Sequence, residues 1–202
     1  MSFFQNTCKP KGLGGSLMVN MMNIGHSPMA EWGLKHIKIN KNDISLDVGC
    51  GGGANIKKLL EKSPKGKVFG IDYSEVSVRK SKKVNKFAVE RKHCEILQGN
   101  VQELPFANET FDVATAFETI YFWPDIDQSF SQIYRVLKKG GIFMVCNESN
   151  GENDKDKKWT EIIKGMKIYT SKEIKYSLEK AGFTHIETNK NAKGWLCVVA
   201  RK

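Results

Sequence analysis

Leu46-Asp47-Val48-Gly49-Cys50-Gly51-Gly52-Gly53 is the stretch that decides the fold of this chain. It continues the apolar run of residues 44–48, an expected strand, and precedes residues 54–62, where apolar side chains recur at helical spacing. Gly49 and Gly51 have no side chains, so the backbone can turn tightly there and approach a ligand closely. The N-terminus of the expected helix adds unpaired N–H groups and the positive end of its dipole. Strand, glycine loop and helix in this order predict a ligand-binding turn.

An acidic residue follows at the end of the next expected strand, residues 67–71. Asp72 lies 19 positions after Gly53 (72 − 53), where a carboxylate can accept hydrogen bonds from two ribose hydroxyls. The loop is not Gly-x-Gly-x-x-Gly, because Ala54 occupies the third glycine position, and no Gly-Lys-Ser/Thr phosphate loop follows. Asp47 would repel a phosphate but can orient an ammonium, directly or through water. The pattern therefore favours a zwitterionic nucleoside over a dinucleotide.

From residue 43 onward, expected strands alternate with expected helices. The strands are residues 44–48, 67–71, 94–98, 111–117, 141–146, 183–188 and 195–200, and the helices are residues 54–62, 75–90, 126–137 and 171–181. The last two strands have no helix between them and predict an antiparallel hairpin. We therefore expect an α/β fold, a Rossmann-like three-layer sandwich whose seven-stranded sheet is mostly parallel.

Several finer expectations concern the helix ends and faces. Val84, Phe87 and Ala88 should share one face of the helix over residues 75–90. Asp125 with Gln128 should cap the helix that Lys138-Lys139-Gly140 closes, and Thr170 with Glu173 should cap the last helix before Gly182. The polar and charged residues 150–158 should form a surface excursion.

Residues 1–42 differ from the rest of the chain. They are rich in glycine and methionine, with weak helical character around residues 17–23 and stronger character over residues 28–37. We expect an N-terminal helical cover segment, with a single domain over residues 43–202. Whether this segment is a mobile cover over the site or only packs on the sheet stays open.

Composition excludes several classes of protein. The 202 residues are 40% hydrophobic and 27% charged, as in an ordinary globular protein. No window approaches about 18 consecutive apolar residues, and the first residues do not resemble a secretory signal, so we expect a cytoplasmic protein without a membrane span. The net charge of +10 permits RNA as a partner. Because 28 of the 32 basic residues are lysine, a solvated surface is the favoured explanation.

The five cysteines do not suggest a metal centre. Cys8, Cys50, Cys94, Cys146 and Cys197 are odd in number, far apart and form no Cys-x-x-Cys pair. We therefore expect reduced thiols packed as small apolar groups, with no disulfide framework and no metal.

Taken together, these landmarks resemble the class I S-adenosylmethionine-dependent methyltransferases, particularly the small-molecule branch that includes menaquinone and ubiquinone biosynthesis enzymes. Four segments carry the resemblance in order, namely residues 47–53, 70–74, 99–106 and 135–141. The resemblance covers residues 40–147, and the order of elements extends it to the C-terminus.

The resemblance implies that S-adenosylmethionine is the methyl donor and S-adenosylhomocysteine the product. It implies roles for nine residues: Asp47, Gly49, Cys50 and Gly51 at the methionyl part, Asp72 at the ribose, Tyr73, Asn100 and Val101 at the adenine, and Phe117 near the sulfonium. Asn100 stands where the family commonly has Asp, but its carbonyl can still accept from an exocyclic amine.

Methyl transfer from a sulfonium is an in-line displacement that depends mainly on positioning. A base is needed only if the acceptor must lose a proton. The candidates are Glu118 and Tyr121, after the fourth strand, and His26 in the N-terminal segment. Trp123 and Trp32 are candidate apolar walls.

The acceptor is expected to be a small molecule, methylated on O, N, S or C by a monomer or homodimer. The Asn/Asp-Pro-Pro-Tyr/Phe signature of amino-methyltransferases is absent after the fourth strand. Two alternatives stay open. One is an RNA methyltransferase that uses the lysine-rich surface, and the other is a non-catalytic protein that binds S-adenosylmethionine.

Overall fold

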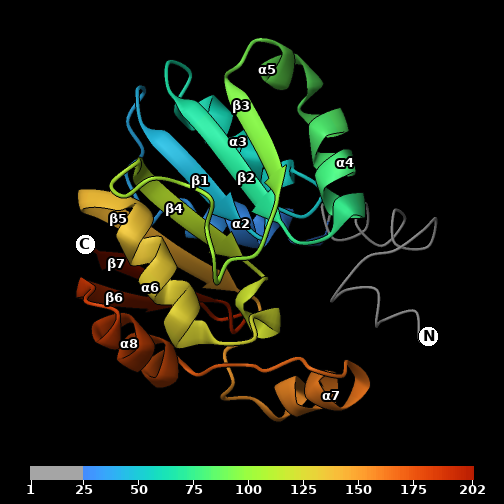
Figure 1. Ribbon diagram of the computed structural model, residues 1–202. Coiled ribbons are helices and arrows are strands. Elements are labelled where there is room, and N and C mark those ends of the chain that lie inside the picture. The colour runs from blue at the N-terminus through green and yellow to red at the C-terminus, as the bar shows by residue number, and fades with distance from the viewer. Residues whose placement is uncertain (1–24) are drawn as a thin grey trace.

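The chain folds into a seven-stranded sheet with helices on both faces (Figure 1). The structure is a computed structural model that describes residues 25–202, apart from the side chains of residues 154, 155 and 157. The strand order is β3-β2-β1-β4-β5-β7-β6. The first five strands run parallel, while β7 pairs antiparallel with both β5 and β6. The predicted fold class, including the C-terminal antiparallel hairpin, is confirmed.

The elements follow the predicted order. The strands are β1 Ile44–Val48, β2 Lys67–Asp72, β3 Cys94–Gln98, β4 Phe111–Phe117, β5 Leu137–Asn147, β6 Thr184–Lys190 and β7 Leu196–Arg201. The helices are α2 Ser27–Gly33, α3 Ala54–Lys62, α4 Glu75–Val84, α5 Lys86–Glu90, α6 Ile126–Val136, α7 Asp154–Ile162 and α8 Ser171–Lys180, with a short 3-10 helix, η2, at Ile120–Phe122. The predicted bounds of β1, α3, β3 and β4 are those observed.

Two hydrophobic cores lie on the two faces of the sheet. One contains the apolar stripes of α6 and α8, including Phe130 and Ile174. The other contains those of α2, α3 and α4, including Met29 and Ile56. Because both faces are covered, the central strands are buried on both sides, and their residues form nearly continuous apolar runs.

The expected helix over residues 75–90 is broken at Asn85, and of its predicted apolar face only Ala88 packs against the core. Val84 is 41% exposed and Phe87 is 78% exposed. The buried Asn85 side chain donates from Nδ2 to the carbonyl oxygen of Gly53 at 3.0 Å and to that of Ser81 at 3.1 Å. An asparagine side chain that bonds to backbone groups competes with the helical ladder, so α4 ends there and α5 starts in a new direction.

Lys138-Lys139-Gly140 does not close α6, as the sequence predicted, but belongs to β5. Lys138 Nζ binds Asp112 Oδ1 on β4 at 2.8 Å, and the Gly140 N–H donates to the Lys202 carbonyl at 2.9 Å. These partners lie far away in the sequence, so pairing in the sheet takes precedence over a helix cap. At the N-terminal end of α6, half of the predicted capping box is present: Asp125 Oδ1 accepts from the Gln128 N–H at 3.0 Å, whereas the Gln128 side chain bonds to Gln102.

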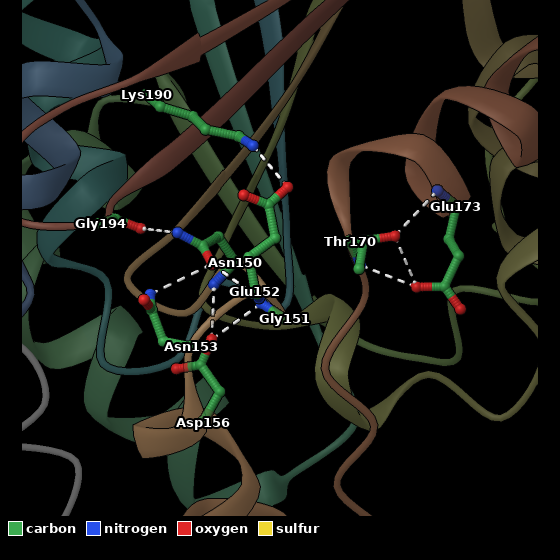
Figure 2. Close-up of polar contacts among 9 residues, drawn as sticks. All are labelled: Asn150, Gly151, Glu152, Asn153, Asp156, Thr170, Glu173, Lys190 and Gly194. Carbon is green, nitrogen blue, oxygen red and sulfur yellow. Dashed lines mark hydrogen bonds and ion pairs between the residues drawn. The ribbon is translucent and has the colours of Figure 1, made fainter.

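The segment after β5 is not simply a surface excursion. It contains α7, and both Asn150 and Asp156 are buried. Asp156 Oδ2 accepts from the N–H groups of Asn150 at 3.1 Å and Gly151 at 2.8 Å, while Asn150 Nδ2 donates to the Gly194 carbonyl at 2.8 Å (Figure 2). These contacts tie the segment to the turn between β6 and β7.

The last helix begins as the sequence predicts. The Glu173 N–H donates to Thr170 Oγ1 at 3.3 Å, and the Thr170 N–H donates to Glu173 Oε2 at 2.8 Å (Figure 2). This reciprocal capping box satisfies backbone donors that the first turn of α8 leaves unpaired. Gly182, with φ +100°, follows the end of the helix.

Part of the N-terminal segment is described. The helix predicted over residues 28–37 is observed as the shorter α2, which ends at Gly33, and it packs on β5 through Met29 and Gly33. The weaker helix expected over residues 17–23 lies outside the described residues. Within residues 25–202, no helix combines the length and apolar character needed to cross a membrane. The four cysteines of this part, Cys50, Cys94, Cys146 and Cys197, are free and buried.

Candidate active site

A pocket of about 430 Å³ opens at the carboxyl ends of the parallel strands. Its walls come from the loops after β1, β2, β3 and β4, together with His26 and residues 164 and 165. In open α/β sheets, ligands bind at this edge, where the strand order reverses on either side of β1. The size is within the range of about 300–1,000 Å³ that is typical of small-molecule sites.

The glycine loop forms one wall of the pocket. The N–H groups of Gly49 and Cys50 both donate to the Ile71 carbonyl, at 2.8 Å and 3.0 Å, so the loop is attached to β2. Gly49 and Gly51 have φ angles of +73° and +50°, which residues with a side chain rarely adopt. A Cβ atom at Gly49 would collide with the Thr119 side chain, whereas one at Gly51 would meet no described atom within 4 Å. Gly51 therefore presents bare backbone to the open pocket.

Asp72 connects this loop with the end of β2. Its Oδ2 accepts from the Gly51 N–H at 2.9 Å, and its Oδ1 accepts from the Ser74 N–H at 2.8 Å. Burial raises the pKa of Asp72, although these two backbone donors act in the opposite direction. The carboxylate lines the pocket at the position where the sequence predicted a ribose contact.

Asp47 lies behind the loop, and the pocket wall does not include it. The carboxyl is 1% exposed, and its Oδ1 accepts from Thr115 Oγ1 at 2.8 Å. Within the described part of the chain, Oδ2 has no hydrogen-bond partner. Burial raises the pKa of Asp47 to about 7, with a smaller contribution from the charge of Asp72. The structure thus places this predicted binding residue one layer behind the pocket wall.

The other predicted cofactor-binding residues line the pocket together. They are Cys50, Tyr73, Asn100, Val101 and Phe117. Burial raises the pKa of the Cys50 thiol well above its usual value, so this side chain lines the pocket as an uncharged thiol. Asn100 Oδ1 already accepts from the Gln102 N–H at 3.0 Å, which leaves one lone pair for a ligand.

The predicted base candidates converge at one end of the pocket. His26 and Glu118 line it, while Tyr121 is buried behind them and reaches the site only through Glu118. Tyr121 Oη donates to Glu118 Oε1 at 3.1 Å, and the Glu148 N–H also donates to Oε1. His26 Nδ1 lies 3.8 Å from Glu118 Oε2 and 3.3 Å from Glu148 Oε1.

The electrostatics of this cluster favour a charged histidine and a partly protonated acid. Burial raises the pKa of Glu118 to about 7, although the nearby His26 opposes it. Burial alone would lower the pKa of His26, but its contact with Glu148 and the charges of Glu118 and Glu148 outweigh burial and raise it.

Sequence reasoning missed several residues at the site. Glu148, which follows β5, approaches His26, and Thr119, Phe122, Lys164 and Gly165 line the pocket. The position of Glu148 just after a parallel strand was the available signal, but nothing in its neighbours pointed to chemistry. Of the two predicted apolar walls, Trp123 lines the pocket. Trp32 packs against Trp195 instead, with ring centroids 6.0 Å apart.

Comparison with known proteins gives a consistent result. Residues 39–182 match the family described as "Methyltransferase domain". The chain is 29% identical to 24-methylenesterol C-methyltransferase 3 of Arabidopsis thaliana over 168 residues, which are 78% of this chain and 46% of that protein. It is 37% identical to the demethylmenaquinone methyltransferase of Alkalihalophilus pseudofirmus over 119 residues, 58% of this chain and 49% of that protein. The chain thus spans about half the length of these curated relatives.

Among solved structures, the fold is similar to that of a SAM-dependent methyltransferase from Aquifex aeolicus. The TM-score is 0.76, the sequence identity is 23%, and the match covers 92% of this chain and 97% of the other. At this level of identity the likeness establishes the arrangement of strands and helices around the pocket.

Proposed function

Because the chain belongs to the methyltransferase domain family, we propose that it transfers the methyl group of S-adenosylmethionine to a small-molecule acceptor. The observation that carries the proposal is the pairing of Gly51 with Asp72. Bare backbone faces the pocket at Gly51, and the Asp72 carboxylate holds the N–H of that residue at 2.9 Å while lining the same pocket. This arrangement suits a nucleoside whose ribose meets an acid and whose chain passes close to a glycine loop.

The residues of the pocket offer a suitable partner for each part of S-adenosylmethionine. Asp72 would accept from the ribose hydroxyls, and the glycine loop from Gly49 to Gly51, with Cys50, would hold the methionyl part. The adenine would lie between Tyr73, Asn100 and Val101, with Phe117 beside the sulfonium. Asp47, one layer back, would reach an ammonium group through an intervening water, since its Oδ2 is unpaired among the described residues.

The chemistry supplied by the bound donor is an already activated methyl group, so the protein's contribution is to position the acceptor in line. His26 and Glu118 lie at the same end of the pocket as Phe117 and would face the acceptor. Tyr121 would act indirectly, since it holds Glu118 in place from behind. A base at Glu118 is needed only for an acceptor that must lose a proton.

We infer that the acceptor has an apolar part. Phe122, Trp123 and Pro124 contribute apolar surface to the pocket beyond the cofactor-binding residues. The relatives named after sterols and menaquinone support this class of acceptor. We also retain the proposal that residues 1–42 cover the site, which is supported by the position of His26 in the pocket wall, at the start of α2.

Calorimetric titration of the full chain with S-adenosylmethionine, S-adenosylhomocysteine and NAD tests the cofactor. We expect micromolar binding of the first two ligands and no binding of NAD. Failure of both adenosyl ligands to bind would refute the proposal. A screen of apolar acceptors with labelled donor then tests catalysis. Binding without turnover on any acceptor would favour a non-catalytic role, and a steep salt dependence of binding to RNA would favour an RNA acceptor.

A further inference from the structure

We propose that His26, Glu118 and Glu148 form a binding site for a divalent transition-metal ion at the end of the pocket. The three residues come from segments that are distant in sequence: the start of α2, the loop after β4 and the loop after β5. One ligand atom from each lies within 4.8 Å of the other two. The Cys and His spacings of the sequence gave no sign of a metal centre, because these ligands meet only in the folded chain.

The distances fit an ion of the first transition row. Ligand atoms bound at about 2.1 Å in a tetrahedral arrangement are about 3.4 Å apart. His26 Nδ1 lies 3.3 Å from Glu148 Oε1 and 3.8 Å from Glu118 Oε2. The Glu148 side chain is 36% exposed, so it has room to adjust when an ion binds.

The donor set defines the class of ion. One imidazole and two carboxylates suit Mn²⁺, Fe²⁺, Co²⁺ or Zn²⁺, whereas Mg²⁺ and Ca²⁺ prefer ligands that are all oxygen. Three protein ligands leave at least one coordination position open, as in catalytic rather than structural sites. His26 and Glu118 line the pocket, so the open position faces it.

The nitrogen that would bind the ion lies between the two carboxylates. The His26 Nδ1 atom is buried, although the side chain is 29% exposed, and it pairs with Glu148 Oε1 at 3.3 Å and with Glu118 Oε2 at 3.8 Å. This nitrogen and one oxygen of each glutamate therefore lie within 4.8 Å of one another, so that one cation could replace the proton that the histidine shares with them.

Glu118 is held as metal-binding carboxylates commonly are, by hydrogen bonds to the oxygen that does not face the ion. Its Oε1 accepts from Tyr121 Oη at 3.1 Å and from the Glu148 N–H, which leaves Oε2 directed at His26. Tyr121 is itself fixed by the Ser149 N–H at 3.1 Å. Glu118 also has a φ angle of +54°, which is strained for a residue other than glycine and is typical of functional positions.

The role of the ion rests on the proposed function, but its binding does not. At the acceptor end of the pocket, the open coordination position can take an oxygen or nitrogen atom of the acceptor and orient it toward the methyl group. The site therefore favours acceptors with such an atom next to the carbon or heteroatom that is methylated.

The test is a titration of the full, metal-stripped chain with Co²⁺, followed by visible absorption and calorimetry without any adenosyl ligand. We expect one Co²⁺ per chain, and at least tenfold weaker binding in His26→Gln and in Glu148→Gln. Both side chains are partly exposed, so the variants should fold, and circular dichroism confirms it. No binding, or binding that these variants leave unchanged, would overturn the proposal. A thiolate charge-transfer band in place of the expected spectrum would also overturn it, because it would place the ion on a cysteine.

Matched controls exist for both residue types. His185→Asn changes an exposed histidine on β6 at a φ angle of +49°, which asparagine tolerates. Glu31→Gln changes an exposed glutamate on α2 that pairs with Lys58. Both should bind Co²⁺ as the unaltered chain does. A chain that binds Co²⁺ but no S-adenosylmethionine would refute the proposed function alone, and the reverse result would refute the metal site alone.

Discussion

Replacement of Gly51 by alanine separates the ligand-binding role of the glycine loop from its structural role. The added methyl group would meet no described atom within 4 Å and would project into the pocket. The backbone N–H of residue 51 would still donate to Asp72 Oδ2. The folded state is therefore destabilised only by the unfavourable φ angle of the alanine. A bound ligand, in contrast, would collide with the added methyl group.

The two effects differ in size. Alanine at a φ angle of +50° costs about 1–2 kcal/mol of stability, as expected for a residue forced into the left-handed region. A domain with about 5–15 kcal/mol of unfolding free energy remains folded after this loss. If the loop contacts the methionyl chain, the methyl group should weaken S-adenosylmethionine binding at least tenfold, or about 1.4 kcal/mol.

The assay combines urea unfolding with calorimetric titration of S-adenosylhomocysteine. Gly140→Ala is the matched control, because its φ angle is +77°, its Cβ also meets no described atom within 4 Å, and it lies outside the pocket. We expect similar losses of stability in Gly51→Ala and Gly140→Ala, but loss of affinity in Gly51→Ala alone. Wild-type affinity in Gly51→Ala would refute the claim that the ligand approaches this loop.

Three further predictions concern buried and exposed residues. Asp47→Asn removes a carboxyl that the folded chain keeps protonated up to about pH 7. Because the unfolded chain releases this proton near pH 4, the unfolding free energy of the wild type should fall by up to about 4 kcal/mol, relative to the variant, as the pH rises from about 4 to about 7. Urea unfolding across that window checks this, and a constant difference between the two proteins would contradict it. Asn85→Ala should lower the unfolding free energy by about 1–3 kcal/mol, since the Gly53 carbonyl loses its side-chain donor; an unchanged urea midpoint would argue against this role. Phe87→Ser should change stability by less than about 0.5 kcal/mol, because the ring is 78% exposed, and a larger loss in thermal unfolding would restore Phe87 to the core.

Local patterns in the sequence were sufficient for most of the fold. The apolar run before Gly49, the helical spacing after Gly53 and the acid at Asp72 depend on neighbours within a few residues, and the structure places them as expected. The capping box of Thr170 and Glu173 is equally local and is confirmed. Such features can be predicted because backbone geometry and side-chain periodicity act over one or two turns of a helix or along one strand.

Expectations failed where a distant partner decided the local structure. The helix over residues 75–90 breaks because Asn85 reaches Gly53, which lies 32 positions earlier. Lys138 joins the sheet because it pairs with Asp112 on β4. In each case a contact made by tertiary packing outweighed helix propensity, which is weak per residue.

The sequence by itself predicted a pocket at the ends of the parallel strands, because the residues that line it follow the strands in order. Only the tertiary structure decided which side chains from distant parts of the sequence meet at or behind the pocket wall. It placed Asp47 behind the pocket wall and Tyr121 behind Glu118, and it brought Glu148 to His26. Spacing along the chain carries no information about such encounters, because they depend on how α2 docks on β5 and on how two strand ends meet across the sheet.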